Sequence, residues 1–296
     1  MIIDTFMFNG EFSSLKIRLS ELYNTVDLFI ICEGKYTHSG IKKDELFTAN
    51  SEVISEFKEK IRIVIDHRRH FTYYAPIREM LQRQLISGEL KKLGLNENDL
   101  IIHSDCDEVP RESTIKNLIK IGVDCNVLLE MNNYINYLNV CAGKWSRARV
   151  ISGAKYKSIQ NMRQDIFLLQ AFNKRRHRMP LIRVPNYWTN RRFLLWKLPK
   201  FIFHKPKIDI VKDAGWHFNN LFNADNIISK IESSSHTEMN TVVIKKVAID
   251  RFKQGRDIYT GEKYGVVEID ASYPDIVFKN MARWGKNIFT QNTDLV

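Results

Sequence analysis

The sequence of 296 residues lacks the segments that mark membrane-spanning and secreted proteins. It contains no run of about 18 or more apolar residues, which a helix needs to cross a bilayer. The first residues, MIIDTFMFNGEF, also lack the basic start and the long apolar stretch of a secretory signal. These absences predict a soluble, cytoplasmic protein.

Cysteine is scarce, and its spacing excludes the common zinc and redox motifs. The four cysteines form no CxxC pair and no Cys/His set with zinc-ligand spacing. Their mostly apolar neighbours indicate free thiols in a reducing compartment. Cys106 lies between two acidic residues, which disfavour its thiolate form, so we interpret it as a small spacer and not as a nucleophile.

Acidic residues are missing from positions 166–208, although the chain as a whole carries a net charge of +11. That stretch holds eleven lysines and arginines, so the positive charge is concentrated in one segment. Aromatic residues are interleaved with the cations between positions 184 and 207. Such a segment suits an anionic or sugar ligand, a membrane surface, or a single-stranded nucleic acid, and the alternative is a basic surface loop with core aromatics.

The first half of the chain alternates strand-like and helix-like patterns. Apolar, β-branched runs predict strands, and apolar residues at helical spacing predict helices between them. The predicted strands are 2–8, 27–34, 60–66 and 99–105, and the predicted helices are 13–26 and 76–95. This order predicts an α/β fold with a mostly parallel, doubly wound sheet flanked by helices. The second half is less regular, and without a clear linker we expect one continuous domain, residues 1–296.

The fourth predicted strand ends in a cluster of acids, in the sequence DLIIHSDCDEVP (99–110). Asp105 and Asp107 form a DxD motif, followed by Glu108 and Pro110. Crowded carboxylates repel one another unless a positive charge offsets them, and Mg²⁺ or Mn²⁺ prefers carboxylate and phosphate oxygens. Ligands of doubly wound sheets bind outside the carboxyl ends of the strands. The motif therefore suits a metal that bridges to a nucleotide diphosphate, with a solvated acidic turn as the alternative.

Several linked blocks of the sequence resemble glycosyltransferase family 17. They are IIDTFMFNGEF, LKIRLSELYNTVDLFIICEGKYTHSG, LQRQL, DLIIHSDCDEVP, DAGWHF and SSSHTE, spread over residues 2–120 and 213–240. The family includes the animal enzyme that adds the bisecting N-acetylglucosamine to N-glycans, with bacterial and viral relatives. The resemblance implies a GT-A glycosyltransferase fold with a Rossmann-like sheet. Residues 1–120 would form the nucleotide-sugar-binding half, and residues 121–296 the acceptor-binding half.

The resemblance also implies the chemistry and the metal ligands. It implies a UDP-sugar donor, with UDP-N-acetylglucosamine as the family default, a divalent Mn²⁺ or Mg²⁺, and an inverting transfer to a glycan or glycoconjugate. Asp107 would bind the metal, and Asp105 would contact the metal or the ribose. His217 in GWHF would be a third metal ligand, with a core histidine as the alternative.

Three further residues are implied to bind the donor. Glu11 and Glu33, at the ends of the first two predicted strands, would contact uracil or ribose, with ordinary loop acids as the alternative. Arg83 lies on the helix before the DxD strand and would pair with the diphosphate through its guanidinium. A surface ion pair is the alternative for Arg83.

An inverting transfer needs one group that accepts the proton of the acceptor hydroxyl. The candidates are Glu238, His236, Asp213, Glu130 and Asp165. We favour Glu238 as the catalytic base. The alternative is a helix-capping SxxE pair of Ser235 with Glu238.

Two other classes of function fit parts of the sequence. The basic aromatic segment, residues 174–207, fits a single-stranded nucleic-acid-binding protein, but no RNA-binding signature is present and we expect no nucleic-acid partner. A DxD motif would also serve a sugar-nucleotide hydrolase or a nucleotidyltransferase. Residues 141–212 show little resemblance to the family, so the acceptor is less defined than the donor. In a transferase, the basic segment would hold the acceptor or rest on a membrane surface near a lipid-linked glycan.

Overall fold

The N-terminal half of the chain forms four parallel strands, as the alternating pattern predicts. The structure is a computed structural model, and it describes residues 1–43, 45–49, 51–68, 75–163, 208–221, 224–234 and 237–290. The strands are β1 (Ile2–Met7), β2 (Leu28–Gly34), β3 (Ile61–Asp66) and β4 (Leu100–Asp105). They lie side by side in the order β3-β2-β1-β4, and each is within one residue of its predicted bounds.

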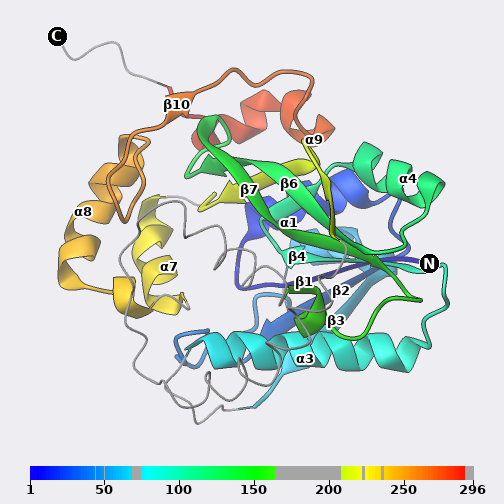
Figure 1. The fold of residues 1–296 in the computed structure, drawn as a ribbon. Coiled ribbons are helices and arrows are strands. Elements are labelled where there is room, and N and C mark those ends of the chain that lie inside the picture. The colour runs from blue at the N-terminus through cyan, green and yellow to red at the C-terminus, as the bar shows by residue number, and fades with distance from the viewer. Residues whose placement is uncertain are drawn as a thin grey trace, which may run out of the picture.

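Helices cover both faces of these strands (Figure 1). Helix α1 (Phe12–Leu22) packs on one face, and α3 (Ala75–Leu93) packs on the other. Between β2 and β3 lie the short α2 (Glu52–Glu56) and the 3-10 turn η1 (Lys58–Lys60). α1 ends earlier than predicted because the chain turns after Leu22 and brings the Asp27 backbone N–H against the Ile2 carbonyl, at 2.9 Å.

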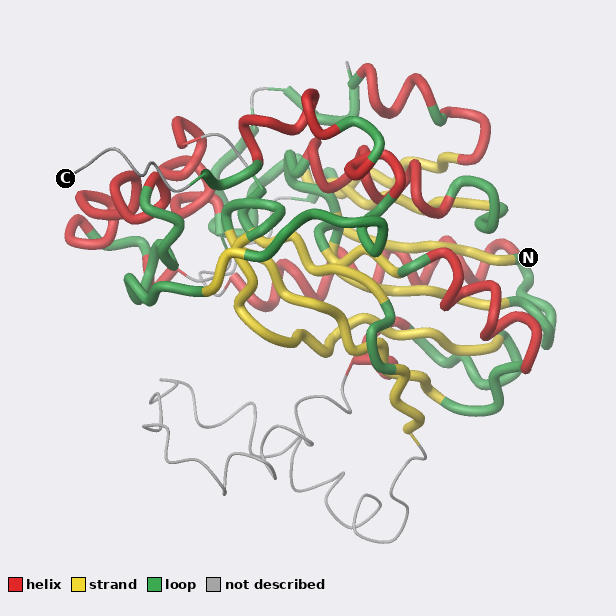
Figure 2. The backbone as a smooth tube through the Cα atoms, turned by 90° about the horizontal axis from the view of Figure 1, so that it is seen from above, coloured by secondary structure: helices red, strands yellow, loops and turns green. Residues whose placement is uncertain are grey.

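The second half extends the same sheet, mostly with antiparallel pairs. β7 (Val140–Ser152) runs antiparallel to β4, and β6 (Asn126–Ile135) runs antiparallel to β7. Next to β6 lies the parallel β9 (Gly215–Asn219), which pairs antiparallel with β5 (Glu108–Pro110). The short strands β8 (Ile208–Val211) and β10 (Gly265–Val266) pair with β6 and β7. The result is one curled sheet flanked by helices (Figure 2), consistent with the expected Rossmann-like glycosyltransferase fold.

The remaining helices pack in separate clusters of the core. α4 (Glu112–Ile121) joins the core on the α1 face, and α7 (Ile227–Ser233) packs with α8 (Val242–Lys253) in a smaller cluster. The shorter elements are η2 (Ala224–Asn226), η3 (Thr237–Met239), α9 (Asp275–Phe278) and η4 (Met281–Asn287). Among the helices of the described ranges, none is both long and apolar enough to span a bilayer.

One edge of the sheet gathers the segments that build the candidate site. The carboxyl ends of β1, β2 and β4 lie along this edge because the three strands are parallel. The turn after β1 contains Gly10, whose φ of 94° favours glycine and whose Cα lies so near the ring of Phe47 that a Cβ would be 3.2 Å from it. Helix α7 lies beside this edge although it is distant in sequence (Figure 1). Open α/β sheets bind ligands at this position.

Candidate active site

The acidic turn between β4 and β5 is held from inside the protein by an arginine of α1. Arg18 donates to both carboxylate oxygens of Asp4, at 2.6 and 2.7 Å. It also donates to the backbone carbonyls of Asp105 and Glu108, at 2.9 and 2.6 Å. Arg18 and Asp4 are completely buried. This arrangement holds the turn firmly, because displacing either partner would leave a buried charge uncompensated.

Asp105 is bound by arginine. Arg163 donates to its two carboxylate oxygens at 2.8 and 3.1 Å, and Arg83 lies 3.6 Å away. Burial by itself would raise the pKa of Asp105, but the charges of Arg163 and Arg83 hold that pKa far below its ordinary value. Arg83 also pairs with Glu79 on the same helix. Arginine therefore supplies the positive charge that the crowded acids require at this position.

Asp107 faces a histidine instead. β9 pairs with β5 so that His217 lies opposite Glu108, and its Nε2 is 3.7 Å from Oδ1 of Asp107. The other ring nitrogen, Nδ1, donates to Oδ1 of Asn133 at 2.8 Å. The indole of Trp145 stacks on the imidazole with a centroid distance of 4.3 Å and an angle of 17°. Asn133 and Trp145 thus hold the imidazole with Nε2 directed at Asp107.

Burial and charge act in opposite directions on His217. Burial lowers the pKa of the imidazole, but the carboxylate of Asp107 raises it, and the net result is a raised pKa. Glu108 is buried beside this pair and accepts from Trp145 Nε1 at 2.5 Å and from the Asp105 backbone N–H at 3.0 Å. Burial, followed by the negative charge of Asp105, raises the pKa of Glu108. Glu108 therefore contacts both sides of the motif: it binds the backbone of Asp105, and it binds Trp145, which stacks on the histidine that faces Asp107.

Asp107 and His217 have a spacing that fits one shared divalent cation. Two atoms bound to the same ion at about 2.1 Å are about 3 Å apart at right angles and about 4.2 Å apart when opposite. The observed 3.7 Å lies within this range. The other predicted ligand, Asp105, has both oxygens in hydrogen bonds with Arg163. Within the described residues, a trio of possible ligand atoms within 4.8 Å of one another occurs elsewhere, at Asp124, Cys125 and Asp209.

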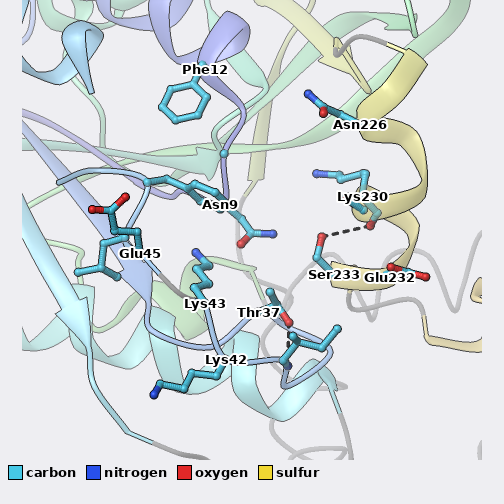
Figure 3. A pocket seen from close by; sticks show the side chains of 15 residues that line it. Asn9, Phe12, Thr37, Lys42, Lys43, Glu45, Asn226, Lys230, Glu232 and Ser233 are labelled. Atoms are coloured by element: carbon cyan, nitrogen blue, oxygen red, sulfur yellow. Dashed lines mark hydrogen bonds between the residues drawn. The ribbon is translucent and has the colours of Figure 1, made fainter. Parts of the chain in front are cut away.

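A cavity of about 770 Å³ opens at the carboxyl ends of β1 and β2 (Figure 3). Its walls come from three segments: the turn after β1, the loop after β2 and helix α7. The lining residues are Asn9, Gly10, Phe12, Thr37, Ile41, Lys42, Lys43, Glu45, Leu46, Phe47, Asn226, Ser229, Lys230, Glu232 and Ser233. The volume is within the range of pockets that enclose small molecules and cofactors, about 300–1,000 Å³.

Glu11 connects the turn after β1 to helix α7. Its Oε1 accepts from Lys230 Nζ at 2.8 Å, and its Oε2 accepts from the Asn9 backbone N–H at 2.7 Å. Burial by itself would raise the pKa of Glu11, but the charge of Lys230 and the Asn9 N–H lower it below its ordinary value. A second contact, from the Ser39 N–H to the Ser233 carbonyl at 3.3 Å, joins α7 to the loop after β2. The two contacts fasten this wall of the cavity.

Glu33 holds the loop after β2 in place. The side chain is completely buried, and its Oε1 accepts from Lys43 Nζ at 2.9 Å and from the Phe47 N–H at 2.8 Å. Its Oε2 accepts from the Thr48 N–H at 2.9 Å. Both oxygens are therefore engaged by the loop that lines the cavity. In this arrangement Glu33 shapes the cavity wall, whereas the sequence suggested direct contact with uracil or ribose.

The candidate bases lie in different places. Glu238 is exposed on η3, and its negative charge contributes to the raised pKa of Tyr259, after burial and against the opposing charge of Lys230. Asp213 accepts from Asn132 Nδ2 at 3.0 Å. Arg111 pairs with Asp213 and also lies over the ring of Trp216. Because Trp216 and His217 are successive residues of β9 and point to opposite faces of the sheet, Asp213 lies on the face away from His217. Of the other candidates, Glu130 lies in β6, whereas His236, Asp165 and the basic segment 174–207 lie outside the described residues.

Sequence reasoning missed two cations of this site, Arg163 and Lys230. Neither belongs to a recognisable motif: Arg163 lies 58 positions from Asp105, and Lys230 lies 219 positions from Glu11. Asn133 and Trp145 were also not assigned, since asparagine and tryptophan in a strand carry no sign of a histidine partner. The structure does bring Asp107 and His217 together, which their sequence positions alone do not require.

Comparison with known proteins identifies one family. A family model described as Glycosyltransferase family 17 matches residues 1–170 of the chain. A search of curated proteins finds no match. Among solved structures, the chain is similar to the inositol-1-phosphate CTP transferase from T. maritima. That similarity has 9% sequence identity and a TM-score of 0.30, and covers 72% of this chain and 85% of the other.

Proposed function

The chain belongs to glycosyltransferase family 17, and from this premise we propose that it transfers N-acetylglucosamine from a UDP-sugar to a hydroxyl of a glycan or glycoconjugate. The proposed reaction inverts the anomeric carbon and requires Mn²⁺ or Mg²⁺. The observation that carries the proposal is the Asp107–His217 pair beside a cavity at the carboxyl ends of β1 and β2. The two features adjoin at the sheet edge, because Met7 of β1 pairs with Asp105 of β4. The turn after β1 carries Asn9 of the cavity lining, and the turn after β4 carries Asp107.

Asp107 and His217 are the residues that we propose to hold the metal. Their ligand atoms are 3.7 Å apart, and Asn133 and Trp145 orient the imidazole. When bound, the metal would neutralise the charge on the donor's diphosphate as it leaves. Asp105 would support this arrangement through Arg163, because that pair keeps the turn in place without using Asp107.

The transfer forms a bond from the acceptor oxygen to the anomeric carbon and breaks the bond to the diphosphate. The hydroxyl proton must pass to a base, and we propose Glu238 for this role. Its support is position: Glu238 lies on η3, which packs against α7, the helix that lines the cavity. Asp213 is disfavoured because it lies on the opposite face of the sheet from His217.

A melting-temperature screen of UDP-sugars with and without Mn²⁺ tests this proposal. We expect UDP-N-acetylglucosamine to raise the melting temperature only with Mn²⁺, because a ligand that binds the folded state stabilises it. Asp107→Asn removes the effect, whereas Asp275→Asn, which changes an exposed acid of α9, retains it. Absence of a response to every UDP-sugar would contradict the proposal.

Product analysis separates the transferase from its nearest alternative. With UDP-N-acetylglucosamine and a glycan acceptor, we expect UDP and an extended glycan. Free N-acetylglucosamine produced at an equal rate with and without acceptor would identify a sugar-nucleotide hydrolase instead. An acceptor panel that includes lipid-linked glycans addresses the proposed membrane contact of the acceptor side.

A further inference from the structure

Lys230 holds an unusual position in the cavity. It extends from α7 toward the turn after β1 (Figure 3), where its Nζ meets Glu11 at 2.8 Å. The lysine side chain is 22% exposed and the glutamate side chain 12%, so the pair lies mostly out of solvent. Burial lowers the pKa of Lys230, but Glu11 and then Asp107 raise it, and the net shift is upward. The ammonium charge is thus maintained at the boundary between the cavity and the candidate metal ligands.

The other two lysines of the cavity differ from Lys230. Lys43 is buried and donates to Glu33, and that carboxylate also holds the loop backbone. Lys42 is exposed to solvent, so its charge acts through water and is weakened by salt. Lys230 alone among the three both lines the cavity and pairs with a carboxylate of the turn after β1. That turn adjoins the acidic turn that carries Asp107, because Met7 of β1 pairs with Asp105 of β4.

The chemistry of a nucleoside diphosphate matches this placement. When the bond between the anomeric carbon and the diphosphate breaks, the electron pair stays on the diphosphate oxygen and its negative charge grows. An ammonium is a compact point charge that binds phosphate, and its attraction is strong where water is partly excluded. A cation fixed there before the reaction stabilises the developing charge without moving.

We propose that Lys230 binds the diphosphate of the donor and that Glu11 positions it for this contact. The inference rests on the proposed function, and it adds a charged group from a part of the chain beyond the residues matched by the family model. In this arrangement, the end of β1 supplies the carboxylate, and α7 supplies the cation.

A purely structural role for Lys230 makes a different prediction. If the Glu11–Lys230 pair only fastens α7, losing it loosens one wall of the cavity and weakens the binding of UDP and of uridine equally. If Lys230 binds phosphate, its loss weakens the binding of UDP and leaves the binding of uridine unchanged. The ratio of the two dissociation constants therefore separates the two roles.

The test measures UDP binding by calorimetry and uridine binding by displacement of UDP, both with Mn²⁺ present. For Lys230→Met we expect UDP affinity to fall at least tenfold while uridine affinity changes less than twofold. Lys230→Arg keeps the charge and should recover most of the loss. The matched control is Lys245→Met, because Lys245 of α8 forms a comparable pair with Glu232 of α7, the helix that carries Lys230, at 3.0 Å.

Each outcome supports or overturns the assignment. If Lys230→Met binds UDP and uridine equally more weakly, or binds UDP as well as the parent does, the assignment of Lys230 is overturned and the proposed function stays intact. If Lys230→Met does not fold, Lys230→Arg and Glu11→Gln decide the matter by the same ratio. In Glu11→Gln, UDP must weaken more than uridine, because the ammonium loses the group that positions it. Failure of the unmodified protein to bind UDP would instead refute the proposed function.

Discussion

The two acids of the DxD motif meet different cations, although only Cys106 separates them. Asp105 is bound through both oxygens by Arg163, with Arg83 nearby. Asp107 lies 3.7 Å from an imidazole nitrogen, and among the described residues no arginine pairs with it. The planar guanidinium occupies both oxygens of one carboxylate, whereas the histidine leaves room for an ion between two ligand atoms. The same sequence motif therefore contains one acid suited to support and one suited to ligand binding.

The largest expected effect tests the proposed role of Asp107 as a metal ligand. Asp107→Asn should lower transfer at least about 100-fold, because the proposed metal site loses its charged ligand while the fold keeps its internal contacts. Initial rates with saturating Mn²⁺ measure the loss. The free energy of unfolding without ligands serves as the control, and we expect it to change by less than about 1 kcal/mol. A strongly destabilised variant would show that Asp107 also supports the fold, and the two acids would then not differ in role as we propose.

The second effect tests the structural role of Asp105, which pairs with Arg163. Asp105→Asn should lower the free energy of unfolding by about 2–3 kcal/mol, because Arg163 is left charged and mostly buried. This value is below that of a fully buried pair, since the Asp105 side chain is 34% exposed. Denaturant titration measures it. The double variant Asp105→Asn/Arg163→Met should lose less than the sum of the single variants, and strict additivity would show that the two side chains do not interact.

A smaller effect sharpens the assignment of His217. Asn133→Ala removes the acceptor that orients the imidazole, and we expect Mn²⁺ affinity to fall about tenfold. Titration of Mn²⁺ followed by electron paramagnetic resonance measures this directly. Asn132→Ala is the matched control, because the side chain of this neighbouring asparagine of β6 bonds Asp213 and Lys144 and makes no hydrogen bond to His217. Equal Mn²⁺ affinity in the Asn133 variant would show that this hydrogen bond does not govern the metal site.

The smallest effect concerns the Glu11–Lys230 pair and depends on pH. Glu11→Gln should cost about 1 kcal/mol of unfolding free energy at neutral pH, because glutamine keeps an acceptor oxygen but loses the charge. The pKa of Glu11 is lowered in the folded state, so its carboxylate stabilises the fold above the ordinary value of 4.5. That stabilisation is lost as the pH falls through the folded-state pKa. The difference between the variant and the parent should therefore shrink below pH 4.5, and a difference independent of pH would exclude the ion pair as its cause.

The parallel half of the fold follows directly from sequence pattern. Continuous apolar runs such as residues 27–34 are typical of strands covered on both faces, and helices of sufficient length separate them. The structure confirms these strands within one residue. Sequence also placed the acidic turn correctly at a carboxyl end, because parallel strands end at a common edge. These features depend on short-range periodicity, which a single sequence displays.

The pairing of charges could not be predicted in the same way. Arg163 and Lys230 reach their partners across 58 and 219 positions, and in sequence they look like ordinary surface cations. Glu33 shows the converse case, since its position at a strand end suggested a ligand, but its oxygens are engaged by Lys43 and the neighbouring backbone. Which cation meets which acid depends on strand order and loop path, and local pattern does not contain that information.

The attachment of α7 to the β1 turn has a consequence for how the protein is made. During translation, β1 to β4 leave the ribosome well before Lys230 is added, since Glu11 and Lys230 are 219 positions apart. The four parallel strands can form early, but the cavity gains its third wall only when α7 emerges. A ligand that needs all three walls would therefore bind only after α7 has been added.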